Sequence, residues 1–335
     1  MSNKSNAQPT AEKFKSKIGG QALIEGIMML GPTTGAMACR LPDGTIDLET
    51  WDENNGKNAP WYKKTPLVRG CCSFVTSLVK GYKYMMKSAE KQLPEDEQEE
   101  NKEKEESSVY DIFMYIGILI GVAMAVGLFV FLPKIIVGFI PDVKEHRILR
   151  SVLEGVVKIV LFVAYMALVS LMKDIRRQYM YHGAEHKTIA CHEAELPLTV
   201  ENVRKQTRFH KRCGTSFIFL VILISIIVSS LVAILFPELR ATRALWMAVK
   251  ILLLPVLLAI GYEVLQYAGK HDNLFVKISS APGLWMQRIT TKEPTDDIIE
   301  VAIKATEKCL GIDSEPQEEV IDPIELSEED EENDS

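Results

Sequence analysis

The sequence lacks the two glycine motifs that mark the commonest nucleotide-binding loops. Neither the Walker-type phosphate loop nor the dinucleotide fingerprint occurs in its 335 residues. In proteins that use these motifs, the glycines let backbone amides approach the phosphates closely. Nucleotide chemistry of either kind therefore has no support, and we expect no nucleic-acid partner.

The N-terminal segment 1–17 lacks an apolar core and is polar and basic. A cleavable secretory signal contains an apolar stretch of roughly 7–15 residues. We therefore expect no cleaved signal here, and we expect the first membrane span to direct the chain to the membrane.

Charge is absent from two long stretches, one between Asp111 and Lys134 and one between Arg212 and Glu238. Each exceeds the roughly 20 residues that cross a hydrocarbon core about 30 Å thick. Two further apolar stretches are interrupted, Ile148–Met172 by Arg150, Glu154 and Lys158, and Ala244–Tyr262 by Lys250 and Pro255. We predict four membrane spans, with a buried helix of a soluble domain as the alternative for the interrupted pair.

Lys and Arg are distributed unevenly among the connecting loops. The loop 173–212 contains nine of them, whereas the loop between spans three and four contains only Arg240 and Arg243. The loop between spans one and two is also basic, which weakens the contrast. Because cytoplasmic loops are enriched in Lys and Arg, we predict that the central loop and both termini are cytoplasmic.

Cysteine is scarce, with six residues that this topology places on the cytoplasmic side or at its membrane edge. Disulfides are rare in that compartment, so the thiols are free, buried or metal-bound. The net charge of −7 hides a second contrast, because segments 311–335 and 95–106 carry −12 and −6 and leave +11 for the remainder. A basic folded part suits a surface near anionic lipid headgroups. The acidic segments are typical of disordered chain.

These patterns divide the chain into six segments. We predict a disordered N-terminus (1–17), a cytoplasmic α+β region (18–92), an acidic linker (93–108), a four-span membrane domain with the cytoplasmic loop 173–212 (109–268), a cytoplasmic C-terminal segment with a helix (269–311) and a disordered acidic tail (312–335). The predicted fold class is a mainly α membrane protein with a small N-terminal α+β region that contains a β-hairpin.

Glycine and turn residues give two local signals in the N-terminal region. The glycines of Ile18–Gly31 indicate tight turns or close backbone approach. Pro42-Asp43-Gly44, between Met37–Arg40 and Thr45–Glu49, predicts the hairpin.

Val68–Lys91 has the periodicity of an amphipathic helix. Phe74, Leu78, Tyr82 and Met85 share one face, and Lys80, Lys83 and Lys87 would suit a membrane surface. A helix packed on the N-terminal region is the alternative.

At the C-terminal end, we expect Gly269–Trp285 to be irregular. Asp296–Leu310 is predicted to be a helix with Thr295 as its N-cap and Gly311 after its end.

The central loop contains the residues that could carry chemistry. His182 and His186 are four apart, so on a helix they share a face and could bind one metal ion. Glu185 completes the H-x-x-E-H order of the inverzincin metallopeptidases, in which the Glu takes a proton from the activated water. Zinc suits that chemistry because it lowers the pKa of a bound water to about 7. Gly183 weakens the helix inside the motif.

Further metal ligands could come from nearby. His210 and Cys213 lie just before the third span, and Glu263 lies at the predicted cytoplasmic end of the fourth. The alternative is that these histidines are neutral surface or packing groups among lipid phosphates. His192 has the weakest case as a ligand, because a His beside Glu193 is usually solvated.

Charges inside the predicted spans suggest another use of the chain. Glu154 and Lys158 are four apart and could pair on one helix face, and Lys250 starts from the same outer side. A charge inside a membrane costs at least about 2.5 kcal/mol and marks a functional site by default. A polar pore or relay is one interpretation, and a position of Glu154 and Lys158 near the outer interface is the other.

Four separated motifs resemble those of a known family. They are Gly19–Met29, Tyr181–Thr188, Arg212–Ser216 and Pro282–Thr291. Over about residues 15–305 the chain resembles the YqhQ-like family of bacterial membrane proteins, a domain of unknown function often labelled a predicted metal-dependent enzyme. The resemblance implies a bacterial inner-membrane location, supports metal binding and supplies no substrate.

The leading hypothesis from the sequence is an inner-membrane metalloprotein that binds a divalent metal ion, most simply zinc. His182 and His186 are the first ligands, one of His210, Cys213 and Glu263 completes the site, and Glu185 is the catalytic base for hydrolysis of a peptide or lipid-headgroup bond. A non-catalytic membrane adaptor that binds a partner protein or anionic lipid is the alternative, and a transporter or channel is a lesser one. The oligomeric state is left open.

Overall fold

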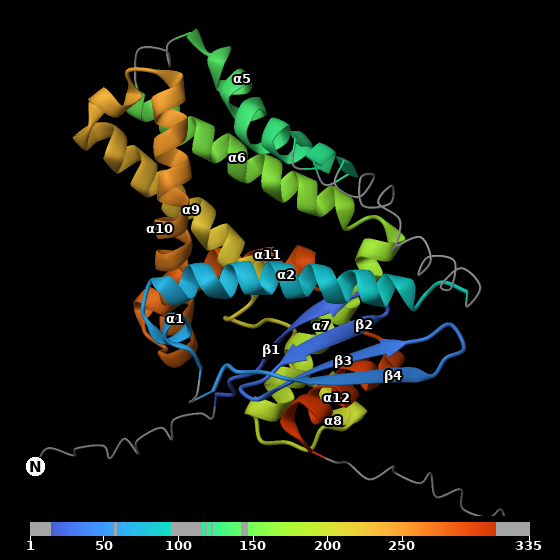
Figure 1. Ribbon diagram of the computed structural model, residues 1–335. Coiled ribbons are helices and arrows are strands. Elements are labelled where there is room, and N and C mark those ends of the chain that lie inside the picture. The colour runs from blue at the N-terminus through green and yellow to red at the C-terminus, as the bar shows by residue number, and fades with distance from the viewer. Residues whose placement is uncertain are drawn as a thin grey trace, which may run out of the picture.

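The computed structural model describes residues 15–56, 59–94, 116–141 without 118 and 122, and 147–312. These residues form a mostly helical molecule with one four-stranded sheet. In Figure 1, long helices extend to one side of a compact layer in which the sheet lies between helices. Most residues of the predicted disordered ends and of the predicted acidic linker lie outside the described residues, so those predictions stay untested.

The sheet is an antiparallel meander of four strands in chain order. They are β1 (Gly19–Leu23), β2 (Gly26–Leu30), β3 (Thr34–Arg40) and β4 (Ile46–Asp52). The predicted hairpin is confirmed, because β3 and β4 pair from Thr34↔Asp52 to Arg40↔Ile46. Gly44 in its turn has φ +91°, a left-handed conformation that glycine adopts at little cost. The glycine-rich segment before it forms β1 and β2, which the sequence did not predict.

Helix α2 (Val68–Glu90) covers one face of the sheet. Its Tyr84 ring stacks on Trp51 of β4, with 4.2 Å between centroids. Lys80 forms an ion pair with Glu53, and Lys87 forms one with Glu49 of β4. These two lysines therefore hold α2 on the N-terminal region, as the packing alternative proposed.

Helices α7 (Lys173–Glu193) and α12 (Asp296–Leu310) cover the opposite face of the sheet. The core between them contains Ile27, Met29, Ala36 and Ala38 from the sheet, Tyr181, Ala184 and Ile189 from α7, and Ile298, Val301, Ala302 and Ala305 from α12. Because both faces are covered, β2 and β3 are buried along most of their length and lack an alternating polar pattern. The predicted C-terminal helix is confirmed, and its end residue Gly311 has φ +67°.

Four of the described helices are long and apolar enough to cross a membrane. They are Leu119–Gly138, which includes a π-helical turn (η1, Gly127–Phe131) and α5 (Leu132–Gly138), Leu149–Val169 within α6 (Arg147–Val169), α9 (Gly214–Leu235), and Ala244–Lys270 within α10 (Arg243–Lys270). Their mean hydropathy ranges from 2.2 to 3.2. The predicted start of the first span lies outside the described residues.

Short helices connect these elements. They are α1 (Trp61–Lys64), α8 (Val200–Arg204) and the 3₁₀ turn η3 (Pro237–Arg240). The connection 173–212 is therefore mostly helical, through α7 and α8.

The expectation that Gly269–Trp285 is irregular is wrong. α10 continues to Lys270, and α11 (Leu274–Thr290) follows after three residues. The Asn273 side chain caps α11 by accepting a hydrogen bond from the Val276 amide at 3.0 Å. A Cβ on Gly283 would lie 2.5 Å from the Ser216 Cβ, so this glycine lets α11 pack closely on α9. Tertiary packing thus outweighs the low helix propensity of Pro282-Gly283.

Gly183 serves a similar close crossing. A Cβ there would lie 2.0 Å from the carbonyl oxygen of Lys292, in the connection between α11 and α12. The Lys292 amide donates to the Tyr179 carbonyl at 2.8 Å, which fixes the crossing one turn earlier.

We predict that Gly183→Ala destabilises the protein by at least the roughly 1–3 kcal/mol that overpacking costs, since backbone atoms must move. Thermal unfolding of detergent-purified protein measures the effect. Gly19→Ala is the matched control, because a Cβ there meets nothing within 4 Å. Equal melting temperatures for the two variants would contradict the crossing.

Candidate metal centre

Helix α7 carries the H-x-x-E-H residues into the interior of the sheet-containing layer. Glu185, His186, Lys187 and Thr188 are all buried, although the helix is strongly polar. Buried polar groups must find specific partners, because each one left unpaired costs free energy. His182, Glu185 and His186 are three and four residues apart and therefore share the face of α7 that meets the start of α9.

Cys213 joins this face from another element. It is the N-cap residue of α9 and is buried. Its Sγ lies 3.1 Å from Nε2 of His182 and 3.1 Å from Oγ1 of Thr215. His182, His186 and Cys213 each offer a ligand atom, and these atoms all lie within 4.8 Å of one another. We call these three residues the His-His-Cys cluster.

Backbone carbonyls orient both imidazoles. Nδ1 of His182 lies 2.9 Å from the Thr290 carbonyl oxygen, and Nδ1 of His186 lies 2.6 Å from that of Arg208. A carbonyl oxygen can only accept, so Nδ1 is the protonated nitrogen in each ring. In the neutral rings the lone pair is then on Nε2, which is the arrangement of metal-binding histidines whose other nitrogen donates to a fixed partner.

The cluster is strongly coupled electrostatically. Burial opposes charge on His182, but the neighbouring Cys213 raises the pKa of His182 to about 9. Burial likewise opposes the thiolate, but His182 and His186 hold the pKa of Cys213 well below its usual range. Imidazolium and thiolate therefore stabilise each other, and thiolate is the form in which cysteine binds a metal ion.

Glu185 lies beside the cluster in a dry environment. Burial raises the pKa of Glu185 above its ordinary value, although His186 and His182 act in the opposite direction. A Cβ on Gly20 of β1 would lie 3.1 Å from the Glu185 carboxyl carbon. Glycine at this position therefore leaves the room that the carboxyl group occupies.

His210 and Glu193 form a second group next to the cluster. The His210 ring lies 5.6 Å from the His186 ring, and its Nε2 lies 3.9 Å from Oε2 of Glu193. Burial would raise the pKa of Glu193, but the nearby His210 ring and the charge of Arg212 hold that pKa well below the usual range. Ser16 also donates to Glu193, from its amide at 3.0 Å and its hydroxyl at 2.9 Å.

The structure thus sorts the proposed ligands into three groups. It brings His182, His186 and Cys213 together, and it places His210 beside them, paired with Glu193. It does not bring Glu263 to this group, because the Glu263 carboxylate accepts a hydrogen bond from Nε of Arg69 on α2 at 2.8 Å. Among the described residues, no other group of three His, Cys, Asp or Glu side chains meets the same distance limit.

Several residues that position the site escaped sequence reasoning. Gln287 of α11 is fully buried, accepts from the His210 amide at 2.8 Å and donates to the His210 carbonyl at 2.7 Å. The carbonyl groups of Thr290 and Arg208 orient the two imidazoles. The residue types in a sequence do not indicate which backbone carbonyl groups will accept hydrogen bonds from the imidazoles. Only the position of Gln287 and Thr290 inside the fourth family-like motif could have pointed to them.

The donor set and spacing of the cluster fit a zinc-type ion. Bonds of about 2.0–2.1 Å to nitrogen and about 2.3 Å to sulfur put tetrahedral ligand atoms roughly 3.5 Å apart. The distance of 3.1 Å between Nε2 of His182 and Sγ of Cys213 needs only a small widening. Two imidazoles and a thiolate favour zinc or another thiophilic metal over magnesium or calcium.

Fold and site together define a class: a helical protein with four membrane-capable helices, a small sheet-containing layer and a His-His-Cys cluster where the two parts meet. Residues 65–312 match the family described as "Protein of unknown function (DUF1385)". The "Uncharacterized protein YqhQ" of Bacillus subtilis (strain 168) is 36% identical over 309 residues, which cover 90% of this chain and 95% of that relative. The chain belongs to this YqhQ-like family. No solved structure matches it.

A pH test follows from the lowered pKa of Glu193. A carboxyl group whose pKa is lower in the folded than in the unfolded state stabilises the fold above its unfolded value of about 4.3. That contribution is lost as the pH falls towards the folded value. We predict that Glu193→Gln lowers the stability at pH 7 by about 1–3 kcal/mol, and that its difference from the wild type shrinks between pH 5 and pH 3.

Thermal unfolding in detergent across this pH range measures the difference. Glu195→Gln, at an exposed carboxylate two residues further on, should leave the stability nearly unchanged. A difference between wild type and Glu193→Gln that stays constant down to pH 3 would exclude Glu193 as the titrating group.

Proposed function

We propose that the protein is an integral membrane metalloprotein that binds one zinc-type ion at His182, His186 and Cys213. The observation that carries the proposal is the orientation of the two imidazoles by backbone carbonyls, which leaves Nε2 of each ring for a metal, next to a thiolate within the same 4.8 Å group. Structural hydrogen bonding alone would not require two histidines and a cysteine with this geometry.

The proposed location is the bacterial inner membrane, with both termini and the sheet-containing layer in the cytoplasm. Four apolar helices support insertion, and the basic residues of the 173–212 connection favour this orientation. All six cysteines are free thiols, four of them buried, as a reducing compartment allows.

The proposed activity is metal-dependent hydrolysis at the cytoplasmic membrane face, of a peptide or lipid-headgroup bond. A bound zinc ion would supply a Lewis acid that lowers the pKa of water to about 7. Glu185 would then be the proton acceptor, because its carboxyl group is buried beside the cluster and its raised pKa favours holding a proton. The Thr290 and Arg208 carbonyls would keep the two imidazoles in place during the reaction.

A second candidate is a structural metal site in a non-catalytic membrane scaffold that binds a partner protein or anionic lipid. Burial favours it, because the exposed fractions of His186, Cys213 and Glu185 are 1%, 5% and 5%. Structural zinc sites are closed, whereas catalytic sites keep one position open. The basic residues Arg204 and Lys205, which could have attracted such a partner, pair with Asp296 and Glu201 instead.

The transport alternative has less support. Glu154 of α6 accepts a hydrogen bond from Nε of Arg150 at 3.0 Å, one turn earlier on the same helix. This pair accounts for the Glu154 carboxylate without an ion path.

Metal analysis of detergent-purified protein tests the metalloprotein proposal. We expect about one zinc ion per chain in the wild type, and a small residual fraction in His182→Ala plus His186→Ala and in Cys213→Ser, because each removes a ligand. His192→Ala and Cys191→Ser are matched controls on the same helix and should keep the ion. A sub-stoichiometric metal content that the ligand variants leave unchanged would sink the proposal.

Cobalt substitution separates the catalytic from the structural candidate. In a catalytic site, an added hydroxamate should enter the open position and change the visible spectrum of the cobalt protein. Glu185→Gln should keep the metal in either case, and should abolish turnover of a hydrolysable substrate only if Glu185 is the base. A spectrum that hydroxamate leaves unaltered, together with full metal content, would favour the closed structural site.

A further inference from the structure

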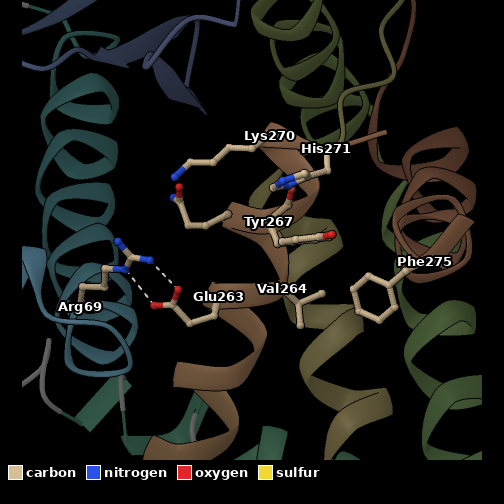
Figure 2. A pocket seen from close by; sticks show the side chains of 8 residues that line it. Arg69, Glu263, Val264, Tyr267, Lys270, His271 and Phe275 are labelled. Atoms are coloured by element: carbon tan, nitrogen blue, oxygen red, sulfur yellow. Dashed lines mark hydrogen bonds and ion pairs between the residues drawn. The ribbon is translucent and has the colours of Figure 1, made fainter. Parts of the chain in front are cut away.

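A pocket of about 490 Å³ lies between the beginning of α2, the end of α10 and the beginning of α11. Figure 2 shows Arg69 reaching from α2 towards Glu263, with Tyr267, Lys270 and His271 along α10 and Phe275 on α11. None of these residues belongs to the His-His-Cys cluster. The pocket is large enough for a small ligand, since such sites usually measure about 300–1,000 Å³.

Helix α10 determines how far the pocket extends along the direction of the apolar helices. Its lining residues on this helix run from Glu263 to His271, the last two turns of α10 and its C-cap. At a rise of 1.5 Å per residue they cover about 12 Å, which exceeds the roughly 5–8 Å of the polar headgroup layer on one side of a bilayer, so at the end of a membrane-spanning helix they cross that layer. On the proposed membrane insertion, the pocket therefore lies where phospholipid headgroups lie, on the side of the sheet-containing layer.

Among the described residues, one positive charge of the pocket forms no ion pair. Arg69 donates to Glu263 through Nε and Nη2, and the Leu67 amide donates to the same carboxylate at 3.2 Å. Lys270 forms no ion pair with any described residue. Because Arg69 and Glu263 neutralise each other, Lys270 gives the Lys, Arg and carboxylate side chains of the pocket a net charge of +1, which matches the single negative charge of a phosphodiester.

The aromatic side chains of the pocket are held in place. The Tyr267 ring stacks on His271 with 4.0 Å between centroids, and it meets Phe275 edge-on at 5.9 Å. Its hydroxyl accepts a hydrogen bond from Nδ2 of Asn273 at 2.9 Å. Aromatic rings with one polar end are enriched at membrane–water interfaces, where they contact glycerol and headgroup atoms.

Apolar side chains continue from the pocket on both sides. Leu67 of the α2 N-terminus is 53% exposed, and Leu274 and Phe275 of α11 are 72% and 55% exposed. A soluble anion would gain nothing from such a rim, whereas the acyl chain of a lipid would cover it and gain about 25 cal/mol per Å² of buried apolar surface.

We propose that this pocket binds one anionic phospholipid through its phosphodiester group. Lys270 pairs with the phosphate, Tyr267 and His271 form the wall beside the headgroup, and the Arg69–Glu263 pair holds α2 against α10 so that the pocket keeps its shape. The acyl chains lie along Leu274 and Phe275. The chemistry that the pocket recognises is a phosphate with one negative charge, and the apolar rim selects a lipid over a free anion.

Native mass spectrometry of the delipidated full-length protein in detergent tests the proposal with phosphatidylglycerol as the probe. The wild type should retain one molecule of this lipid, and Lys270→Gln should weaken its binding about tenfold, the effect of losing one charge-assisted hydrogen bond. Lys277→Gln is the matched control, because this exposed lysine lies on α11 outside the pocket. Tyr267→Leu should also weaken binding, which tests the wall without altering the charge.

Three outcomes would overturn the proposal. One is equal binding of phosphatidylcholine, which would indicate unselective lipid contact. Another is displacement of the lipid by an equal concentration of inorganic phosphate, which would indicate a soluble-anion site. The third is unchanged binding in Lys270→Gln. An alkaline wash of membranes that contain the wild type or Lys270→Gln tests insertion separately. If both proteins stay in the membrane, a loss of lipid binding is not a loss of insertion. Failure of the pocket proposal and failure of the membrane proposal are therefore distinguishable.

Discussion

The burial of a polar helix is the constraint on which the rest of the structure depends. α7 carries His182, His186 and Lys187 into the interior, and each needs a partner that the helix itself cannot supply. The partners come from three separate segments: the carbonyls of Arg204 and Arg208 before α9, the thiol of Cys213 at its start, and the Thr290 carbonyl at the end of α11. The hydrogen bonds of these α7 side chains therefore fix how the connection 205–213 and the end of α11 pass around the helix. The candidate metal centre is where these requirements converge.

A second tie joins the sheet-containing layer to the apolar helices. α2 lies on the sheet through Lys80, Lys87 and the Trp51–Tyr84 stack, and at its beginning it crosses α10 so closely that a Cβ on Gly70 would lie 2.9 Å from the Ala259 Cα. The Arg69–Glu263 pair, which also lines the pocket beside α10, strengthens this crossing. α2 is thus neither a free amphipathic helix nor only a sheet cover, because its first turns belong to the apolar part and its last turns to the sheet.

Sequence patterns predicted the features that depend on local composition. Length and hydropathy were enough for the four apolar helices, turn chemistry for the β3–β4 hairpin, and capping signals for α12. They failed where long-range packing decides. Gly183 was expected to weaken its helix and Gly269–Trp285 to be irregular, yet Gly183 and Gly283 each remove a side chain so that Lys292 or Ser216 can approach a helix closely. The Glu263 carboxylate is a chemically suitable metal ligand, but in the fold it pairs with Arg69 and lies away from the cluster. The sequence alone does not indicate which of these two partners is close to Glu263.

The position of Cys213 gives the proposed metal centre a mechanical consequence as well as a chemical one. This residue is the last before α9, the most apolar of the four membrane-capable helices, so a ligand bond to its sulfur would join the beginning of that helix to the buried face of α7. The next residue, Gly183, is where Lys292 crosses α7, and this crossing fixes the path from α11 to α12. A metal ion at this point would link α7, α9 and, through the Thr290 carbonyl, α11. Catalytic or structural, the site would therefore depend on how the apolar helices and the sheet-containing layer are assembled, because two of its contacts join α7 to the start of α9 and the end of α11.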